Sequence, residues 1–219
     1  MPDFKNNFIS FAISRNVLCF GEFRTKAGRL SPYFFNAGLF NDGDSLRKLG
    51  QFYAKAIEAA ELQFDMLFGP AYKGIPLVSA IAIALAENGK SFPFCFNRKE
   101  VKDHGEGGEL IGAPLAGRVL IADDVISAGT SVRESVHHIR AARANPYAVV
   151  IALDRLERGD GELSATQQVR HSFGIKVISI IDLNDIVNYL QDRKDLVHHL
   201  RAVEEYRTRY GVDQLTGVG

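Results

Sequence analysis

The sequence predicts an α/β fold with a mostly parallel central sheet and helices on both of its faces. Apolar runs of strand length alternate with amphipathic stretches of helical length along most of the chain. Several runs, such as VLIA at residues 119–122, are apolar at every position, which is typical of parallel strands that are buried on both faces. Such an alternation of strands and helices favours a parallel sheet covered on both sides.

The N-terminal segment predicts one helix and two strands. The spacing of Phe4, Phe8, Phe11 and Ile13 places them on one face of an amphipathic helix. Two strand-like runs follow on either side of the turn KAGR, at residues 17–23 and 31–40.

The rest of the chain repeats the alternation of strand and helix. Helices are predicted at residues 46–61, 75–87 and 132–142 and near the C-terminus, and strands at residues 64–69, 92–97, 118–122, 148–154 and 176–182. No internal repeat, low-complexity tract or linker divides the sequence. We therefore expect residues 1–219 to form one domain that buries a sizeable core.

The composition argues against several classes of function. Lys plus Arg and Asp plus Glu both number 26, so no net charge attracts nucleic acid or an anionic membrane. The start of the chain lacks the pattern of a secretory signal, and the most apolar segment, at residues 75–86, is too short to cross a bilayer. Cys19 and Cys95 lie among apolar neighbours, so we expect buried thiols in a reducing cytoplasm.

The run VLIADDVISAGTS, at residues 119–131, places two carboxylates where a predicted strand ends. In parallel α/β sheets, ligands bind beyond the carboxyl ends of the strands. The loop at residues 127–131 leads into a helix, so its hydroxyl and N–H groups suit a phosphate. Asp123 and Asp124 suit hydroxyl groups or a metal ion, and together these features indicate a sugar phosphate.

Two other interpretations of this run remain open. Small and hydroxylated residues before a helix are also typical of an ordinary capped turn, and paired acids often only solvate a strand end. A Walker B strand also ends in acids. It should accompany the pattern G-x-x-x-x-G-K-[ST], which the chain lacks, so nucleotide triphosphate hydrolysis is disfavoured.

The run FGPAYKGIP, at residues 68–76, also passes from a predicted strand into a helix. Gly69 and Gly74 permit the backbone to approach a ligand closely, and Lys73 adds a positive charge at the start of the helix. The run therefore indicates a second anion site. A tight turn with a solvent-exposed lysine is the alternative.

Residues 98–117 predict a long connection with little apolar periodicity, where about four to six residues are usual. Its glycines and its bases favour a hinged lid that covers an anionic substrate and excludes water. A solvated excursion is the alternative, since acids offset the bases. The bases are Arg98, Lys99, Lys102 and His104.

These motifs together carry a family resemblance. VLIADDVISAGTS resembles the phosphoribosyl-diphosphate signature of the type I phosphoribosyltransferases, and FGPAYKGIP with FNRKEVKDHGEGG is similar to their orotate-using members. FGEFRTKAGRLSPYFFNAG and DRLERG match the same pattern, so the resemblance covers nearly the whole chain. It implies the type I fold, with a small hood over residues 1–40 that binds the base.

The implied reaction transfers the 5-phosphoribosyl group of 5-phosphoribosyl 1-diphosphate to orotate, with Mg²⁺, in de novo pyrimidine (UMP) biosynthesis. It yields orotidine 5′-phosphate and diphosphate. Breaking the anomeric C–O bond leaves an oxocarbenium-like ribose and an anionic leaving group, so catalysis consists mainly of holding charge and positioning the base. No serine or cysteine nucleophile is needed.

The resemblance also implies the residues that bind the donor. Lys73 and the lid contact the diphosphate, the two acids take the ribose hydroxyls, and the loop binds the 5′-phosphate. We expect Lys73, Lys102 and Asp124 to be catalytic, and Mg²⁺ to be held mainly by substrate and water near the acids, with no direct ligand assigned. The implied donor contacts are Lys26, Tyr72, Lys73, Arg98, Lys99, Lys102, His104, Asp123, Asp124, Val125, Ile126, Ser127, Ala128, Gly129, Thr130 and Ser131.

Orotate is flat and carries a carboxylate, so its site needs an apolar face and a cationic fork. By resemblance these contacts come from Lys26, Phe34, Phe35, Ser127 and Arg155. Ser127 stands where related proteins often have threonine, and the hydroxyl is kept. Without the resemblance, the two phenylalanines are simply alternating strand residues, one buried and one half exposed, and Lys26 is a turn lysine.

The resemblance implies a homodimer in which lid residues such as Lys102 reach the partner's site. Two other functions are possible for this fold. A regulator that binds nucleic acid can lose the lid lysines, which this chain keeps, and the chain lacks the basic surplus of such proteins. A purine salvage transferase shares the phosphate loop but is not expected to present Arg155 and YFFN to a carboxylated pyrimidine.

Overall fold

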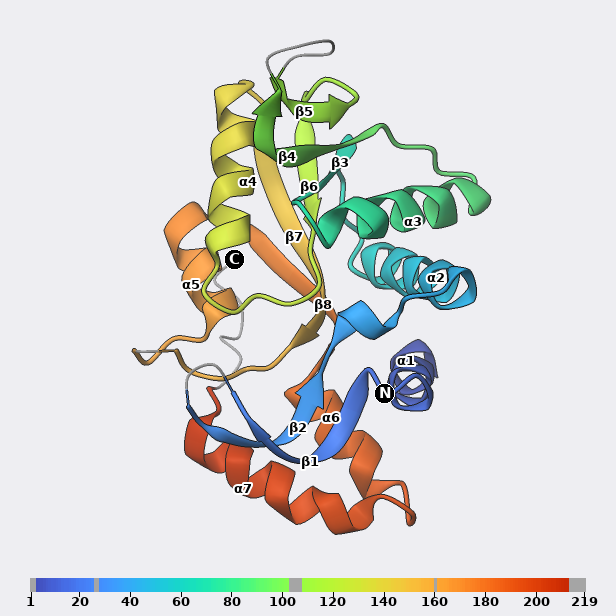
Figure 1. The fold of residues 1–219 in the computed structure, drawn as a ribbon, viewed down its shortest axis with the longest axis vertical. Helices are drawn as coiled ribbons and strands as arrows, with labels where there is room; N and C mark the ends of the chain where they lie inside the picture. The colour runs from blue at the N-terminus through green and yellow to red at the C-terminus, as the bar shows by residue number, and fades with distance from the viewer. Residues whose placement is uncertain (1–2, 26–27, 103–107, 160, 213–219) are drawn as a thin grey trace.

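A six-stranded sheet with the order β5-β4-β3-β6-β7-β8 forms the centre of the protein (Figure 1). The computed structural model describes residues 3–25, 28–102, 108–159 and 161–212. The strands are β3 (Met66–Gly69), β4 (Phe94–Lys102), β5 (Gly108–Gly112), β6 (Arg118–Ala122), β7 (Asn145–Asp154) and β8 (Lys176–Asp182). Only β4 and β5 pair antiparallel within this sheet, so the prediction of a mostly parallel sheet is confirmed.

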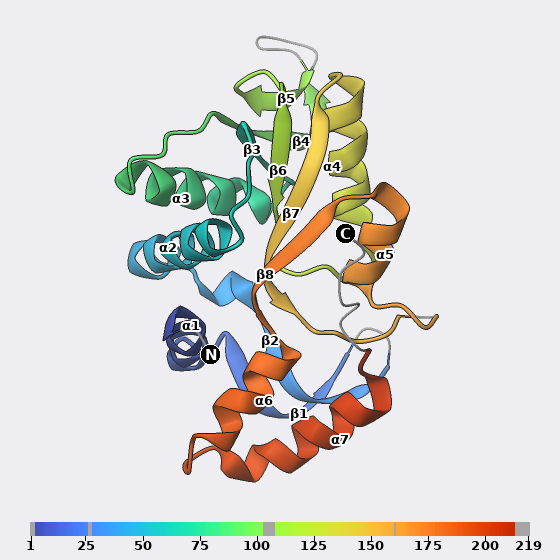
Figure 2. The ribbon, with the colours of Figure 1, turned by 180° about the vertical axis from the view of Figure 1, so that it is seen from behind.

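Helices cover both faces of the sheet, as Figures 1 and 2 show from opposite sides. One face carries α2 (Gly43–Ala59) and α3 (Gly74–Glu87), and the other carries α4 (Thr130–Ala141) and α5 (Ala165–Phe173). The remaining helices, near β8 and the hood, are α1 (Asp3–Ser14), α6 (Leu183–Gln191) and α7 (Leu200–Tyr210), with short 3₁₀ turns η1 (Ala37–Leu39) and η2 (Val197–His199). In the described part of the chain, no helix has the length and apolarity to cross a membrane.

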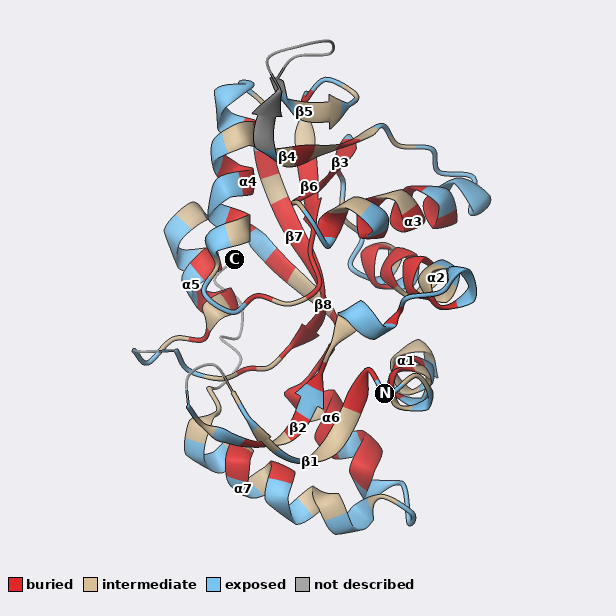
Figure 3. Ribbon diagram, viewed as in Figure 1, coloured by how far each residue is buried: buried red, intermediate tan, exposed pale blue. Residues whose placement is uncertain are grey.

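The alternation of side chains along β6 divides the core into two layers. Val119 and Ile121 belong to the apolar cluster beneath α4 and α5, whereas Leu120 and Ala122 belong to the cluster beneath α2 and α3. Successive side chains of a strand point to opposite faces, so a strand covered on both sides needs apolar residues at every position. Figure 3 shows β6 and β7 almost entirely as buried residues.

The hood is a separate two-stranded antiparallel sheet, made of β1 (Leu18–Arg24) and β2 (Leu30–Phe35). Arg29 ties it to the loop after β7, because its guanidinium donates to the carbonyls of Arg158 and Gly159 at 2.7 and 3.1 Å. The same guanidinium carbon lies 4.8 Å from the ring centre of Tyr210 in α7. The hood is therefore held against the C-terminal helix and the end of the sheet.

Residues 98–117 differ from the expected irregular loop. β4 continues to Lys102, and β5 pairs back with it antiparallel, so this excursion begins and ends as a hairpin arm of the sheet. Backbone hydrogen bonds form this pairing, which is why the apolar pattern did not reveal it. The middle of the arm, at residues 103–107, lies outside the described residues.

Capping residues determine where two of the helices begin. α2 begins at Gly43 instead of Leu46, since the Asp42 carboxylate accepts a hydrogen bond from the backbone N–H of Ser45. The helix α5 was not expected at all. It begins with a capping box in which Ser164 and Gln167 satisfy each other's backbone N–H groups.

Candidate active site

The predicted ligand-binding residues follow the carboxyl ends of three adjacent strands. Lys73 comes after β3, Asp123 and Asp124 come after β6, and Arg155 comes after β7. Because β3, β6 and β7 are neighbours in one parallel sheet, the segments that follow them lie along one edge. The sheet topology therefore brings together three motifs that are far apart in the sequence.

Lys73 and Asp124 form an ion pair, with 2.6 Å between Nζ and Oδ2. The lysine side chain is 60% exposed, whereas the aspartate side chain is only 11% exposed. The pair thus joins a solvent-facing cation to a largely buried carboxylate. An anionic ligand that approaches from solvent meets the ammonium group first.

Asp123 is held by hydrogen bonds on both carboxylate oxygens. Oδ2 accepts from the hydroxyl of Ser131 at 2.6 Å, and Oδ1 accepts from the backbone N–H of Asp124 at 2.9 Å. Burial raises the pKa of Asp123 to about 6, the Ser131 hydrogen bond opposes this rise, and the charge of Asp124 adds to it. The buried hydroxyl of Tyr53 fixes the backbone by donating to the Asp123 carbonyl at 2.8 Å.

This arrangement changes the expected role of Ser131. Its hydroxyl has one proton, which is donated to Asp123, so it does not point that proton at a phosphate in this structure. The backbone N–H of Ser131, in the first turn of α4, remains a potential anion donor.

The loop before α4 leaves the helix N-terminus open. Gly129 adopts a φ of 70° at the N-cap, a left-handed conformation that glycine tolerates best, and no side chain caps the helix. This uncapped end differs from the ordinary capped turn that was the alternative interpretation. Ser127, Ala128 and Thr130 are exposed here, whereas the side chain of Ile126 is buried in the core, so Ile126 can offer a ligand only its backbone.

The loop after β3 is closed by two glycines that contact one another. A Cβ atom on Gly69 would overlap the carbonyl of Gly74, and one on Gly74 would lie 2.6 Å from Cδ of Pro70. The absence of a side chain at both positions is therefore required for the close packing of this loop against the start of α3. The buried Asn97 of β4 also holds this loop, because its Oδ1 accepts from the N–H of Ala71 at 2.8 Å.

Tyr72 links this loop to the hairpin arm. Its ring is 64% exposed, and Nζ of Lys99 lies 5.7 Å from the ring centre. Arg98 lies beside Lys99 in β4. One of the four expected lid cations, Lys99, is thus placed next to the loop that carries Lys73. The backbone of Lys102 ends β4, while Lys26 and His104 lie outside the described residues.

Arg155 lies beneath the hood in a network that the sequence did not reveal. Its Nε donates to Oε1 of Glu157 at 2.9 Å, and Nη2 forms an ion pair with the same oxygen at 2.6 Å and donates to the hydroxyl of Ser31 at 3.1 Å. The guanidinium carbon lies 4.3 Å from the ring centre of Tyr33. Burial opposes the charge of Arg155, but Tyr33 and Glu157 outweigh burial and raise its pKa. The short spacing of the two charges in DRLERG was the only available signal.

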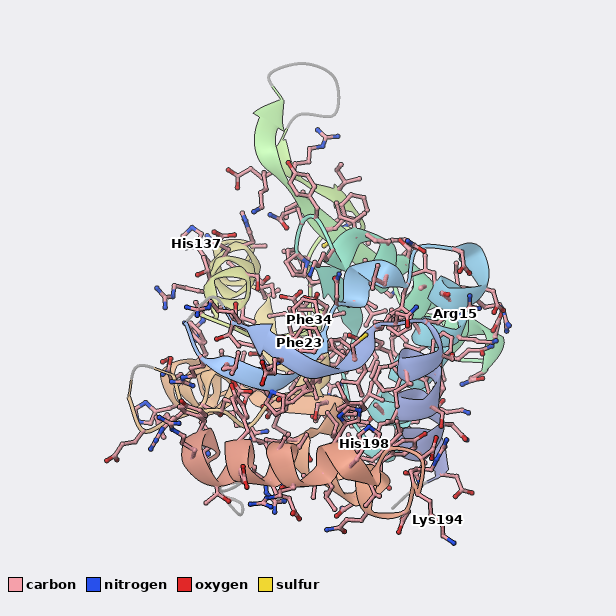
Figure 4. All side chains as sticks on the ribbon, turned by 60° about the horizontal axis from the view of Figure 1, so that its bottom comes forward. Arg15, Phe23, Phe34, His137, Lys194 and His198 are labelled. Carbon is pink, nitrogen blue, oxygen red and sulfur yellow. The ribbon has the colours of Figure 1, made fainter. Side chains whose placement is uncertain are left out.

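The two phenylalanines expected at the orotate site face opposite ways. Phe34 is 46% exposed and stacks on Phe23, with 5.5 Å between ring centres, and Figure 4 labels these neighbouring rings on the hood. Phe35 is buried, with its ring centre 6.4 Å from that of Phe8. The expectation of a side-chain contact from Phe35 is therefore corrected, and only its backbone remains available to a ligand.

A cavity of about 430 Å³ adjoins the ion pair of Lys73 and Asp124. Its other walls come from η1, from the segment that leads into α2 and from the first turn of α3. No sequence motif predicted that residues 37–46 lie beside the expected anion sites. The volume lies within the usual range for pockets that hold small molecules.

Known proteins are similar to this chain in sequence and in fold. The model of the phosphoribosyl transferase domain matches residues 39–163. The orotate phosphoribosyltransferase of Nitrosospira multiformis is 75% identical over 210 residues, which are 96% of this chain and 92% of that protein. The protein of the same name from Nitrosomonas europaea is 64% identical over 96% of this chain and 93% of its own length.

A solved structure agrees with these sequence relatives. The crystal structure of the orotate phosphoribosyltransferase of Francisella tularensis has a TM-score of 0.86 and 41% identity, and the match covers 94% of this chain and all of that one. The family model spans more than half of the chain, and the relatives match it almost from end to end. The chain therefore belongs to the phosphoribosyltransferase family, and within it to the orotate phosphoribosyltransferases.

Proposed function

We propose that this protein transfers the 5-phosphoribosyl group of 5-phosphoribosyl 1-diphosphate to orotate, which yields orotidine 5′-phosphate and diphosphate for pyrimidine biosynthesis. The family membership supports this reaction. The structural observation that carries the proposal is the geometry of the sheet edge. An uncapped helix, a lysine–carboxylate pair and a largely buried guanidinium follow three adjacent strands there.

The donor occupies the part of the edge that follows β3 and β6. The open N-terminus of α4 holds the 5′-phosphate, because N–H groups without a cap and the helix dipole both favour an anion. Asp123 and Asp124 face the ribose hydroxyls. The diphosphate is bound by Lys73 and by the cations of the hairpin arm, which are Arg98, Lys99, Lys102 and His104.

Orotate occupies the part of the edge that lies beneath the hood. The exposed ring of Phe34 provides the apolar face for a flat base, and Arg155 provides donors for its oxygen atoms. Lys26, which lies between β1 and β2 in the sequence, is the second cation that we assign to the carboxylate. Residues 1–40 thus act as the base-binding hood of a single phosphoribosyltransferase domain.

The side chains bind and position the reactants. The bond between C1′ and the diphosphate oxygen breaks, and the diphosphate leaves with both electrons of that bond. A bond from C1′ to a ring nitrogen of orotate forms, and the proton of that nitrogen is released to water. Lys73 and Lys102 stabilise the negative charge that grows on the leaving group. Asp124 holds Lys73 until the substrate arrives and then faces the ribose.

The residues present also suit Mg²⁺. Asp123 and Asp124 supply carboxylate oxygens, which Mg²⁺ prefers, and no cluster of three or more His, Cys, Asp or Glu side chains occurs among the residues that the structure describes. This donor set fits an ion that is held mainly by diphosphate, ribose and water. When bound, the ion neutralises charge on the leaving diphosphate.

We further propose a homodimer in the cytoplasm, with the arm of one subunit completing the site of the other. Cys19 and Cys95 are both free, which suits a reducing compartment. The arm supports the dimer proposal because β4 and β5 form the edge of the sheet, from which the arm projects (Figure 1).

A base-consumption assay tests the proposed reaction. The purified protein is given 5-phosphoribosyl 1-diphosphate and Mg²⁺ together with orotate, uracil or hypoxanthine, and the loss of each base is measured. We expect consumption of orotate alone. Consumption of hypoxanthine instead would support a purine transferase, and inactivity with all three bases together with binding to nucleic acid would support a regulator.

A further inference from the structure

The contacts of the Arg155 guanidinium with Glu157 and Ser31 lie along one of its edges. Nε donates to Oε1 of Glu157, Nη2 forms an ion pair with the same oxygen, and Nη2 donates to the hydroxyl of Ser31. Within the described ranges, Nη1 makes no hydrogen bond. Because a guanidinium is planar and its donors are fixed in direction, holding one edge determines where the remaining N–H groups point.

The carboxylate of Glu157 collects donors from two separate elements. Its Oε1 accepts from Arg155 and from the hydroxyl of Tyr33 in β2, the latter at 3.0 Å. The side chains of Glu157 and Arg155 are only 13% and 24% exposed. The backbone of Glu157 is itself fixed, since it forms a β-bridge with Gly211 after α7. The loop after β7, the hood and the C-terminal segment therefore meet at Glu157, the first two through its carboxylate and the third through its backbone.

A tyrosine of α7 also lies close to this ion pair. The hydroxyl of Tyr206 is buried and has no hydrogen-bond partner in the described part of the chain. Burial raises its pKa, and the nearby charge of Glu157 raises it further. A buried ion pair is in general weak evidence for stability, so the fixed orientation of Arg155 calls for another explanation.

We propose that Glu157 is a positioning residue for the acceptor base. It holds Nε and Nη2 of Arg155, so that the Nη1 edge is presented to the oxygen atoms of a carboxylated pyrimidine. An arginine that is already fixed loses little conformational freedom when the base binds, and this lowers the Michaelis constant (KM) for that base. The inference rests on the proposed function, because it requires Arg155 to contact orotate.

Two substitutions separate geometry from charge. Glu157→Gln keeps an oxygen that can accept from Nε and Nη2, whereas Glu157→Ala removes it. We expect Glu157→Ala to raise the KM for orotate about tenfold or more while the KM for the ribosyl donor stays within about twofold. Glu157→Gln should restore the KM for orotate to within about threefold of the wild-type value.

A matched control comes from another acid that pairs with an arginine. Glu205 of α7 accepts from Nε of Arg201 at 2.8 Å, but both side chains are exposed and lie outside the site. Glu205→Ala should leave both Michaelis constants unchanged. Equal rises in both constants for Glu157→Ala, or no rise in either, would overturn the positioning role. If Glu157→Ala fails to fold, Glu157→Asp carries the same test, because it withdraws the carboxylate by one methylene group.

A double-mutant cycle tests whether Glu157 acts through Arg155. We expect Glu157→Ala to lower kcat/KM for orotate in the wild-type background and to cause no further loss in an Arg155→Ala background. Independent, multiplying losses would overturn the inference. The wild-type protein is assayed first, since failure to consume orotate at all would refute the proposed function and not the placement of Glu157.

Discussion

Nζ of Lys73 lies 2.6 Å from Oδ2 of Asp124, and this ion pair joins the loop after β3 to the loop after β6. The lysine is held in position although most of its side chain is in solvent. Exposed ion pairs contribute only about 0–1 kcal/mol to stability. We therefore propose that the pair presets the orientation of two groups that a ligand separates, and in the proposed reaction the diphosphate binds the ammonium and the ribose binds the carboxylate.

Asp124→Asn should weaken the Mg²⁺-dependent use of the ribosyl donor. The amide keeps the shape of the side chain but removes the negative charge beside the metal and the lysine. We expect turnover to need a higher Mg²⁺ concentration and the KM for the donor to rise. Asp65→Asn is the control, since Asp65 pairs with Arg118 at the start of β6, away from the strand ends that carry the site. Unchanged Mg²⁺ curves for Asp124→Asn would contradict the assignment.

The raised pKa of Asp123 predicts a pH-dependent stability. Its pKa is about 6 in the folded state and 3.8 in an ordinary setting, so the folded state holds the proton more tightly than the unfolded state. Its contribution to stability is therefore present below pH 4 and is lost as the pH rises from about 4 to 6. Between pH 4.5 and 7.5 the loss amounts to about 2 kcal/mol.

Urea unfolding of the wild type and of Asp123→Asn, without Mg²⁺, isolates this contribution. The variant cannot titrate at this position, so its stability relative to the wild type should improve as the pH rises. Comparing the two proteins at each pH removes the effect of the other ionisable groups. A difference that stays constant from pH 4.5 to 7.5 would show that the Asp123 proton is not linked to folding.

Two buried tyrosines should respond differently to removal of the hydroxyl. Tyr33 donates to the Glu157 carboxylate, whereas the Tyr206 hydroxyl has no partner among the described residues. Tyr33→Phe should lower the free energy of unfolding by about 1.5–3 kcal/mol, the usual range for a hydrogen bond to a charged group. Tyr206→Phe should be neutral or stabilising, because it removes an unsatisfied polar group. Urea unfolding of both variants checks this order, and a larger loss for Tyr206→Phe would reverse the interpretation.

Mixing two inactive variants should restore activity if the arm serves the partner's site. Lys102→Ala disables the arm, and Lys73→Ala disables the body of the site, where the exposed lysine can be truncated without harm to the core. A mixed dimer then contains one site with both defects and one site with none. With random exchange half of the dimers are mixed, so about a quarter of all sites should regain activity.

Subunit exchange is verified with differently tagged chains before activity is measured. If the arm serves its own chain, every site keeps one defect, and no activity returns after exchange. That outcome would reject the shared arm while leaving the roles of the phosphate loop and Arg155 untouched.

The sequence predicts the buried strands best because their pattern is the strongest physical signal. β6 and β8 have the predicted bounds, since each is an apolar run that ends in acids. β5 was missed because Gly108–Gly112 is a short edge strand that is held by backbone pairing with β4. The capping box of Ser164 and Gln167 was a readable signal for α5 that apolar periodicity alone overlooks.

The sequence predicts which residues lie at the site, but it does not predict which side chains contact each other there. Strand ends place Lys73, Asp124 and Arg155 at one edge for any parallel sheet in which their strands are neighbours. The partner of each side chain depends on packing. Nothing in the sequence indicates that the Ser131 hydroxyl turns to Asp123, or that Glu157 occupies one edge of the Arg155 guanidinium.

Because of the strand order of the sheet, a ligand can bind at this edge only after the sheet has folded. The edge that carries the site exists only after β3, β6 and β7, which are separated along the chain by α3, the arm and α4, have found their registers. A fragment that lacks β7 has no Arg155, and one that ends before β6 has neither acid. A substrate that binds the native state alone therefore stabilises the whole chain by mass action, so cellular supply of donor and base protects the protein against unfolding.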